Sequence, residues 1–190
     1  ARKAGTVGIA LPEVSVRITD HLNESCNTNE IGDIQVKGPN VFQGYWQMPG
    51  KTKEEFTEDG YFKTGDIGKI DEQGYISIVG RSKDMIISGG YNVYPKEIEL
   101  ILDAMPEVEE SAVVGITHKD FGEAVCAVIV LKNQNNITEE DIIKKLKTQI
   151  ANFKIPKRIF FTKELPRNTM GKVQKNILRE QLQNTFTPSQ

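Results

Sequence analysis

The chain has 190 residues, 38% of them hydrophobic, and its 24 basic and 26 acidic side chains give a formal net charge of −2 at pH 7. This balance argues against a nucleic-acid partner, for which a basic stripe would be expected. No apolar run approaches the roughly 20 residues that cross a bilayer, and the first residues lack a signal-peptide core. We therefore expect no transmembrane segment, and a cytoplasmic setting, or an organelle matrix, as the default. Cys26 and Cys126 have no metal-type spacing and indicate no disulfide framework.

The first part of the chain, up to Gly80, is strand-like and rich in turn residues. Its apolar alternation predicts short strands at 14–18, 33–37, 68–71 and 75–79. One or two turns of helix are expected at 51–56. Short β-segments at this spacing predict a barrel-like or curled sheet.

After Asp84 the pattern changes to alternating strands and helices. Strands are predicted at 108–117, 123–131 and 155–161, and helices at 95–104 and 173–182. A further helix is predicted from Thr138 onward, where residues 138–141, TEED, read as a capped helix start. The nearly continuous apolar run of 123–131 is typical of a central strand. The fold class is therefore mixed α+β or α/β, with a β-rich, barrel-like part followed by a compact α/β domain of about 100 residues.

The segment 80–99, GRSKDMIISGGYNVYPKEIE, joins these two parts. It contains an apolar strand at 85–87, a glycine pair at Gly89 and Gly90, and a helix begun by Pro95 with Glu97 and Glu99 in its first turn. Glycine permits backbone conformations that a Cβ forbids, or lets a ligand approach the main chain. Proline suits the first position of a helix, and acidic residues there favour the helix dipole. Strand, glycine turn and helix predict the edge of a small-molecule site.

This segment resembles the hinge and following loop of adenylate-forming enzymes, the superfamily of acyl-CoA synthetases, luciferases and peptide-synthetase adenylation domains. Its sequence GGYNVYPKEIE is similar to that of the acyl-CoA synthetase branch. Residues 61–66, YFKTGD, resemble the family's turn that ends in aspartate, and residues 166–173, PRNTMGKV, resemble its C-terminal lysine loop. The three motifs occur in the family's order and spacing, and the resemblance runs from about Gly5 to about Arg179.

The resemblance implies a domain organisation. Residues 1–82 would be the last subdomain of a large N-terminal domain, residues 83–184 a mobile C-terminal domain and residues 185–190 a frayed tail. The family's phosphate loop and its threonine–glutamate motif have no match here, which implies the C-terminal part of a longer enzyme. The first eighty residues are then expected to expose an unusually apolar face.

The implied activity is that of an ATP-dependent acid–thiol ligase, which forms an acyl-adenylate and passes the acyl group to coenzyme A. The substrates would be a small-molecule carboxylic acid, ATP and coenzyme A, with Mg²⁺ held mainly outside this chain. Similar wording occurs in malonyl-CoA synthetases and in fatty-acid and aromatic-acid CoA ligases, so the acid stays open. The alternatives are an enzyme that loads a carrier-protein pantetheine, or, for the isolated chain, a non-catalytic fragment or interaction module.

Motif matches assign the site residues. Adenylate formation concentrates negative charge on phosphorus oxygens, so a cation aimed at them stabilises the transition state, and Lys172 is the catalytic candidate. Asp66 would accept hydrogen bonds from the ribose hydroxyls, and the forked guanidinium of Arg81 suits the nucleotide. Taken alone, these residues would be a lysine in a surface turn, an aspartate capping a turn and a partner in a surface ion pair.

Three further residues are assigned to the movement between two reaction steps. Lys83 occupies the hinge position, about which the family's C-terminal domain rotates after adenylation. Gly89 and Gly90 would line the coenzyme A passage, where a side chain would block pantetheine; the alternative for this pair is an ordinary hairpin turn. No residue of the chain is assigned to a metal ion.

Other conspicuous residues carry weaker expectations. His21 and His118 have no catalytic motif around them, and Trp46 is expected to pack beside a turn. The basic cluster of Lys144, Lys145 and Lys147 reads as a solvated helix face or as a site for the 3′-phosphate of coenzyme A.

Overall fold

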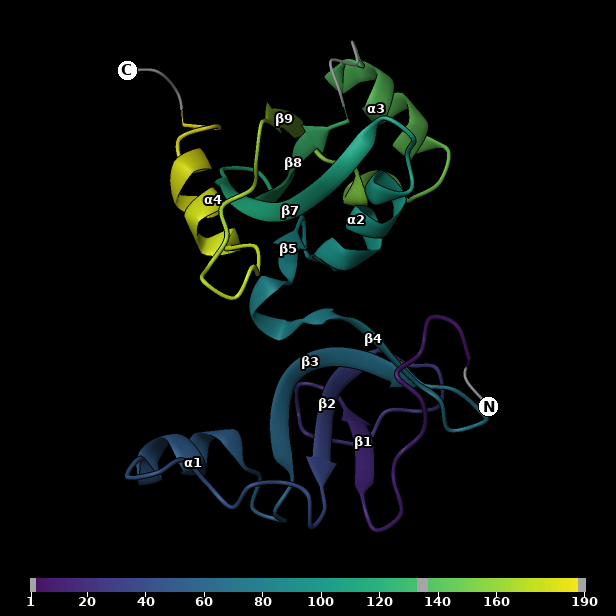
Figure 1. The fold of residues 1–190 in the computed structure, drawn as a ribbon, viewed down its shortest axis with the longest axis vertical. Coiled ribbons are helices and arrows are strands. Elements are labelled where there is room, and N and C mark those ends of the chain that lie inside the picture. Colours follow the sequence, from purple (N-terminus) through teal and green to yellow (C-terminus); the bar gives the residue numbers. More distant parts are fainter. Residues whose placement is uncertain (1–2, 133–136, 188–190) are drawn as a thin grey trace. The chain divides into compact units, whose positions relative to one another are not determined.

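The computed structural model describes residues 3–132 and 137–187, and its contacts divide the chain into two compact units, Ala1–Lys83 and Asp84–Gln190 (Figure 1). Each unit is described by itself. This division lies one residue from the boundary expected between 82 and 83. Of the tail expected to fray, residues 188–190 lie outside the described part, whereas Phe186 packs against the core of the second unit.

The first unit contains an open, four-stranded antiparallel sheet. Its order is β1 (Ser15–Thr19), β2 (Gly32–Lys37), β3 (Phe62–Ile70) and β4 (Ile76–Arg81). Strands β1 and β4 form its two edges, so the described strands do not close into a barrel. Its core is small, because Ile18, Ile34 and Ile76 are the buried residues of its cluster.

Strand β3 begins six residues before the strand predicted at 68–71, and the YFKTGD segment lies largely within it rather than in a turn. Gly65 has a φ of +72°, and the register against β2 shifts between Asp33 and Gln35, so the strand is irregular at this point. A Cβ on Gly68 would lie 2.4 Å from the Ser77 carbonyl oxygen, which makes glycine necessary there. Gly65 and Gly68 interrupt the alternation of apolar and polar residues, so the sequence pattern does not reveal the full length of β3.

A short helix, α1 (Pro49–Glu55), lies in the chain between the members of an aromatic cluster of the first unit. Phe42 makes edge-on ring contacts with Tyr45, Phe56 and Phe62 at centroid distances of 5.0–5.6 Å. Trp46 does not join this cluster and is 87% exposed, so the expectation that it packs beside a turn is wrong.

The second unit is built on one mixed sheet. Its elements are β5 (Ile86–Ser88), β6 (Tyr91–Val93), α2 (Pro95–Asp103), β7 (Val108–His118), β8 (Gly122–Leu131), α3 (Glu139–Lys147), β9 (Arg158–Thr162) and α4 (Lys175–Leu182). The sheet order is β6-β5-β8-β7, with β9 parallel to β8 and the other pairs antiparallel. The apolar strand β8 thus pairs with three neighbours, and the expectation of a central strand is confirmed.

Helices cover both faces of this sheet (Figure 1). Alternate residues of β7 and β8, such as Val113 and Ala127, pack with α2 and α3, whereas their neighbours Val114 and Val128 pack with Leu178 of α4. Successive side chains of a strand point to opposite faces, so a strand buried on both faces needs a continuous apolar run. The mixed fold class is confirmed.

The helix boundaries follow local signals. Thr138 caps α3 by accepting the Asp141 N–H while Asp141 accepts the Thr138 N–H, which is the capping box that the sequence predicts. Helix α4 begins at Lys175 rather than 173, because Val173 forms a β-bridge with Arg167. Helix α2 has Glu97 in its first turn, as expected, whereas Glu99 lies beyond that turn and is buried with 6% exposure. No helix of the described ranges has the length and apolarity of a membrane span.

Candidate functional site

Asp66 and Arg81, the two nucleotide candidates, form a cross-strand pair in the first unit. They are register partners on β3 and β4, and the Arg81 Nε lies 3.0 Å from the Asp66 Oδ1. The Thr64 hydroxyl accepts the Asp66 N–H at 3.0 Å and donates to the Ile34 carbonyl at 2.9 Å. Asp66 is held on two sides while 24% of its side chain remains exposed, so the pair presents a carboxylate and a guanidinium together at one sheet edge.

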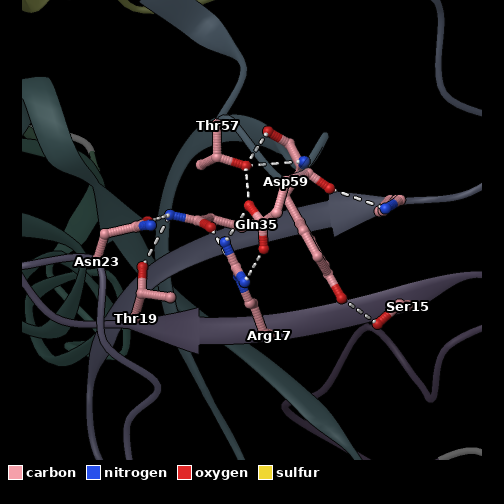
Figure 2. A network of polar contacts seen from close by, with 9 residues as sticks. Ser15, Arg17, Thr19, Asn23, Gln35, Thr57 and Asp59 are labelled. Carbon is pink, nitrogen blue, oxygen red and sulfur yellow. Dashed lines mark hydrogen bonds and ion pairs between the residues drawn. The ribbon is translucent and has the colours of Figure 1, made fainter.

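A polar network holds the turn that precedes β3 (Figure 2). Arg17 donates to both carboxylate oxygens of Asp59, at 2.6 and 3.0 Å, and the Thr57 hydroxyl donates to Asp59 at 2.6 Å. The hydrogen bonds from Arg17 and Thr57 lower the pKa of Asp59 to about 2. The Arg17 guanidinium also lies 3.9 Å from the centre of the Tyr61 ring. This network therefore fixes the start of the YFKTGD segment.

The part of the same network around Gln35 consists mainly of uncharged side chains. The Gln35 amide donates to the Thr19 hydroxyl at 2.9 Å and to the Asn23 side-chain oxygen at 2.6 Å, while its oxygen accepts from the Arg17 Nε at 2.8 Å (Figure 2). Gln35 thus uses both its donor and acceptor capacity, as a buried amide must.

A cavity of about 740 Å³ adjoins this network. Its ionisable lining is mainly acidic: Asp20, His21, Asp33, Glu55, Glu58, Asp59 and Lys63. Desolvation raises the pKa of Asp33, with the Lys63 ammonium opposing that effect. The lining includes neither Asp66 nor Arg81, so the nucleotide candidates lie outside this cavity, whose acidity is also unfavourable for a phosphate.

Lys172 lies in a tight, exposed loop of the second unit, between β9 and α4. The Asn168 side-chain oxygen accepts the Met170 N–H at 3.0 Å and the Lys172 N–H at 2.9 Å, and the Asn168 N–H donates to the Lys172 carbonyl at 2.9 Å. Gly171 has a φ of +77° and open space around it. One asparagine therefore organises the loop around the lysine backbone.

The neighbouring arginine ties this loop to the sheet. Arg167 donates to the Gly171 carbonyl at 2.6 Å and forms an ion pair with Glu110 of β7. No ion pair within the described ranges involves the Lys172 ammonium. The loop backbone is fixed while its lysine head is available.

Two ion pairs anchor α4 behind the loop. Lys175 Nζ lies 2.6 Å from Glu99 Oε1, and the same oxygen accepts the Val113 N–H at 2.9 Å. Arg179 donates to Asp84 at 2.8 Å. Breaking a buried pair leaves an uncompensated charge, so Glu99 and Lys175 are strongly coupled.

Gly89 and Gly90 form the turn of the hairpin between β5 and β6, with φ values of +58° and +82°. Positive φ at both central residues is typical of a type I′ turn and favours glycine. The hairpin alternative for this pair is therefore observed, with strand β6 standing between the turn and the helix. A Cβ added to Gly89 would lie in ordinary contact with a Phe121 ring carbon at 3.7 Å, whereas one added to Gly90 would meet open space.

Lys83 lies within the 3₁₀ turn Ser82–Asp84, at the division between the two units. Its side chain is exposed and enters no ion pair of the described residues, whereas the next residue, Asp84, is bound to Arg179. Asp84 therefore holds one end of this turn through its ion pair, while the Lys83 ammonium beside it takes part in no ion pair of the described residues.

Two of the weaker candidates, Lys145 and His118, make ordinary contacts within the second unit. The Lys145 ammonium lies 2.7 Å from the Glu107 carboxylate, and the His118 ring makes a tilted contact with Phe121 and an edge-on contact with Phe186, at centroid distances of 4.7 and 4.9 Å. Within residues 3–132 and 137–187, no three His, Cys, Asp or Glu side chains group as metal ligands.

Three positioning residues were not recognised from the sequence: Asn168, Glu99 and Glu123. Asn168 had a local signal, because asparagine favours turns that bind their own backbone. Glu99 and Glu123 contact residues far along the chain, Lys175 and Ile87, and a single sequence carries no signal of such a pairing.

The chain is similar in sequence and fold to several known proteins. The AMP-binding enzyme C-terminal domain family matches residues 97–172. The malonate–CoA ligase of Arabidopsis thaliana is 44% identical over an alignment of 195 residues, which covers 97% of this chain and 32% of that ligase. The mitochondrial medium-chain acyl-CoA ligase ACSF2 of Rattus norvegicus is 44% identical, covering 96% of this chain and 30% of its own length.

A solved structure of ATP-bound MatB from Rhodopseudomonas palustris superposes with a TM-score of 0.92 at 56% identity, and the match covers 96% of this chain and 37% of that one. The chain thus spans about a third of the length of these relatives. Residues 97–172 match the AMP-binding enzyme C-terminal domain family, and nearly the whole chain is similar to part of a malonate–CoA ligase and of a medium-chain acyl-CoA ligase.

Proposed function

We propose that this chain is the C-terminal part of an ATP-dependent acid–thiol ligase that forms an acyl-adenylate and transfers the acyl group to coenzyme A. The observation that carries the proposal is the loop around Lys172: its backbone is fixed by Asn168 and Arg167, and its ammonium is not consumed by an ion pair of the described residues. The similarity to acyl-CoA ligases over 96–97% of the chain supports it.

In the first step, Lys172 would place its ammonium against the carboxylate substrate and the nucleotide phosphate. Positive charge aimed at developing oxyanions is a large contributor to such catalysis. Asp66 would accept the ribose hydroxyls, and Arg81 would hold the nucleotide side. Mg²⁺ would be bound by the phosphates and by residues outside this chain.

In the second step, Lys83 would serve as the pivot, and Gly89 and Gly90 would border the passage of the pantetheine thiol. The open space at this turn is consistent with that use. Malonate is the leading acid, because the Arabidopsis relative bears that name, with medium-chain acids as the alternative. We also propose that the protein is cytoplasmic.

Half-reaction assays of the full-length protein test the proposal. Lys172→Ala should lower acyl-adenylate formation by about 10²- to 10³-fold, the range seen for removal of one transition-state donor. Pyrophosphate release with a panel of acids, malonate included, measures this step. Lys163→Ala, a change at another exposed lysine of the same unit, is the matched control. Undiminished acyl-adenylate formation by Lys172→Ala would exclude the assignment.

The glycine turn is tested in the same protein. Gly89→Trp should block thioester formation and leave acyl-adenylate formation in place; equal loss of both steps would contradict the two-step assignment. Replacing coenzyme A by a pantetheine-bearing carrier protein distinguishes the two thiol acceptors. The 190-residue chain alone should not turn over ATP, because the family's phosphate loop has no match in it.

A further inference from the structure

Strand β5 is joined to the rest of its sheet by very few backbone contacts. Its register with β8 consists of one pair, Ser88 with Gly122, and the Gly89 N–H donates to the Phe121 carbonyl at 2.9 Å. Against β6 it forms three pairs. The hairpin that carries the glycine turn therefore depends on few bonds for its position.

The Ile87 N–H is the donor that this arrangement leaves without a ladder partner. In an antiparallel ladder, N–H groups alternate between the partner strand and the opposite side. Ser88 and Tyr91 pair directly beside the turn, so the Ile87 N–H is directed away from β6. It donates instead to the Glu123 Oε2 at 2.8 Å. A side-chain carboxylate takes the place of a missing rung between β5 and β8.

The structure makes room for this carboxylate. Gly115 lies on β7, and a Cβ there would come within 2.7 Å of Glu123 Oε1 and 3.0 Å of the Ile86 Cγ2. Glu123 is partly buried, and no ion pair of the described residues neutralises it. A charged acceptor strengthens a hydrogen bond to a backbone N–H. The missing side chain at Gly115 thus leaves space for the Glu123 carboxylate, which holds β5 through the Ile87 N–H.

We infer that Glu123 is a positioning residue, which fixes the Gly89–Gly90 turn through the Ile87 N–H for the thioester-forming step. This rests on the proposed function, because the turn matters to catalysis only if pantetheine passes beside it. Its effect on the hairpin itself does not depend on that function.

Amide hydrogen exchange of the 190-residue chain tests the structural part. Glu123→Ala should lower the protection of the Ile87 and Gly89 amides about tenfold, the effect of losing one charge-assisted hydrogen bond. Glu123→Gln keeps an acceptor oxygen and should restore most of the protection. Gly115→Ala should loosen the same amides by displacing the carboxylate. Glu109→Ala removes an exposed glutamate of β7 and is the control. Unchanged protection at Ile87 in Glu123→Ala would overturn the inference.

Single-turnover assays of the full-length protein test the functional part. Glu123→Ala should slow thioester formation from preformed acyl-adenylate about tenfold, as expected from its amide exchange, with acyl-adenylate formation unchanged and Glu123→Gln restoring the rate. Equal slowing of both steps, or a loosened hairpin with normal thioester formation, would overturn the positioning role. Either outcome would leave the proposed function standing, because that function is tested separately by Lys172→Ala.

Discussion

Asp59 connects the two parts of the polar network that precedes β3. Its carboxylate accepts from Arg17 and Thr57, and its carbonyl accepts from Lys37 at 2.8 Å. Arg17 reaches back to Gln35, so a charged contact at the surface is continuous with a neutral one inside. The Tyr61 ring packs on the Arg17 guanidinium at one end of this chain of contacts. One carboxylate thereby holds the turn that precedes β3.

The charge of Asp59 should make the first unit sensitive to acid. Its pKa is about 2 in the folded chain against its usual 3.8, so its contribution to stability is present above about pH 4 and is lost as the pH falls toward 2. Asp59→Asn should lower the urea midpoint of β1–β3 signals at pH 6, and the difference from the parent chain should shrink between pH 4 and pH 2. Glu58→Gln, an exposed neighbouring change, serves as control. A difference that is constant with pH would contradict this role.

The loop 167–173 acts as an element although it is neither helix nor strand. Its Arg167–Val173 bridge, the Asn168 bonds and the ion pair to Glu110 define it as closely as a hairpin. A loop fixed by its own side chains costs less entropy to place than a mobile one. The Lys172 backbone is therefore preorganised.

Removal of the Asn168 acceptor should disorder this loop. Asn168→Ala should lower amide protection at Met170 and Lys172, and acyl-adenylate formation by the full-length protein should fall about tenfold, or about 1.4 kcal/mol of barrier. Asn168→Asp retains the accepting oxygen and should keep both amides protected. Exchange rates at Leu178 in α4 check that the fold is intact. Normal protection in Asn168→Ala would show that Arg167 alone suffices.

Elements with a local cause were predictable from the sequence. The apolar run of β8 and the capping box of α3 depend on neighbouring residues, and both were confirmed. Strand β6 was missed because a strand of three residues, which follows a glycine pair and ends two residues before a proline, carries too little periodicity. The site contacts were not predictable, since Glu123 and Ile87 are separated by 36 positions and Arg167 and Glu110 by 57. Resemblance to a motif identifies candidates such as Lys172 and Gly89, but it does not reveal the long-range contacts that hold them in place.

At the scale of the whole molecule, the two units differ in the size of their cores. The first unit buries Ile18, Ile34 and Ile76 in its cluster and exposes many large apolar side chains: Val7, Ile9, Leu11, Leu22, Ile31, Phe42, Trp46, Met48 and Ile78. The second unit has an apolar cluster on each face of its sheet. Burial is the dominant favourable term in folding, so the second unit should be the more stable.

The two cysteines can report on the units separately. Cys26 lies half-buried in the first unit; Cys126 is fully buried in β8, where desolvation raises its pKa to about 12. Only thiolates react with alkylating agents, so Cys126 should stay unlabelled in the native chain at pH 8. In a urea series, Cys26 should become reactive at lower urea than Cys126. Cys26→Ser should leave the Cys126 curve unchanged, and coincident curves would contradict separate stabilities.

The two-sided burial of β7 and β8 also limits how this domain can vary in length. Val113 and Val114 belong to different clusters, as do Ala127 and Val128. Deleting or inserting one residue within either strand would move every following side chain to the opposite face. The helices on the two faces would then meet the wrong set of side chains. Length changes in these strands should be tolerated only in pairs of residues, and single insertions should be confined to the turns.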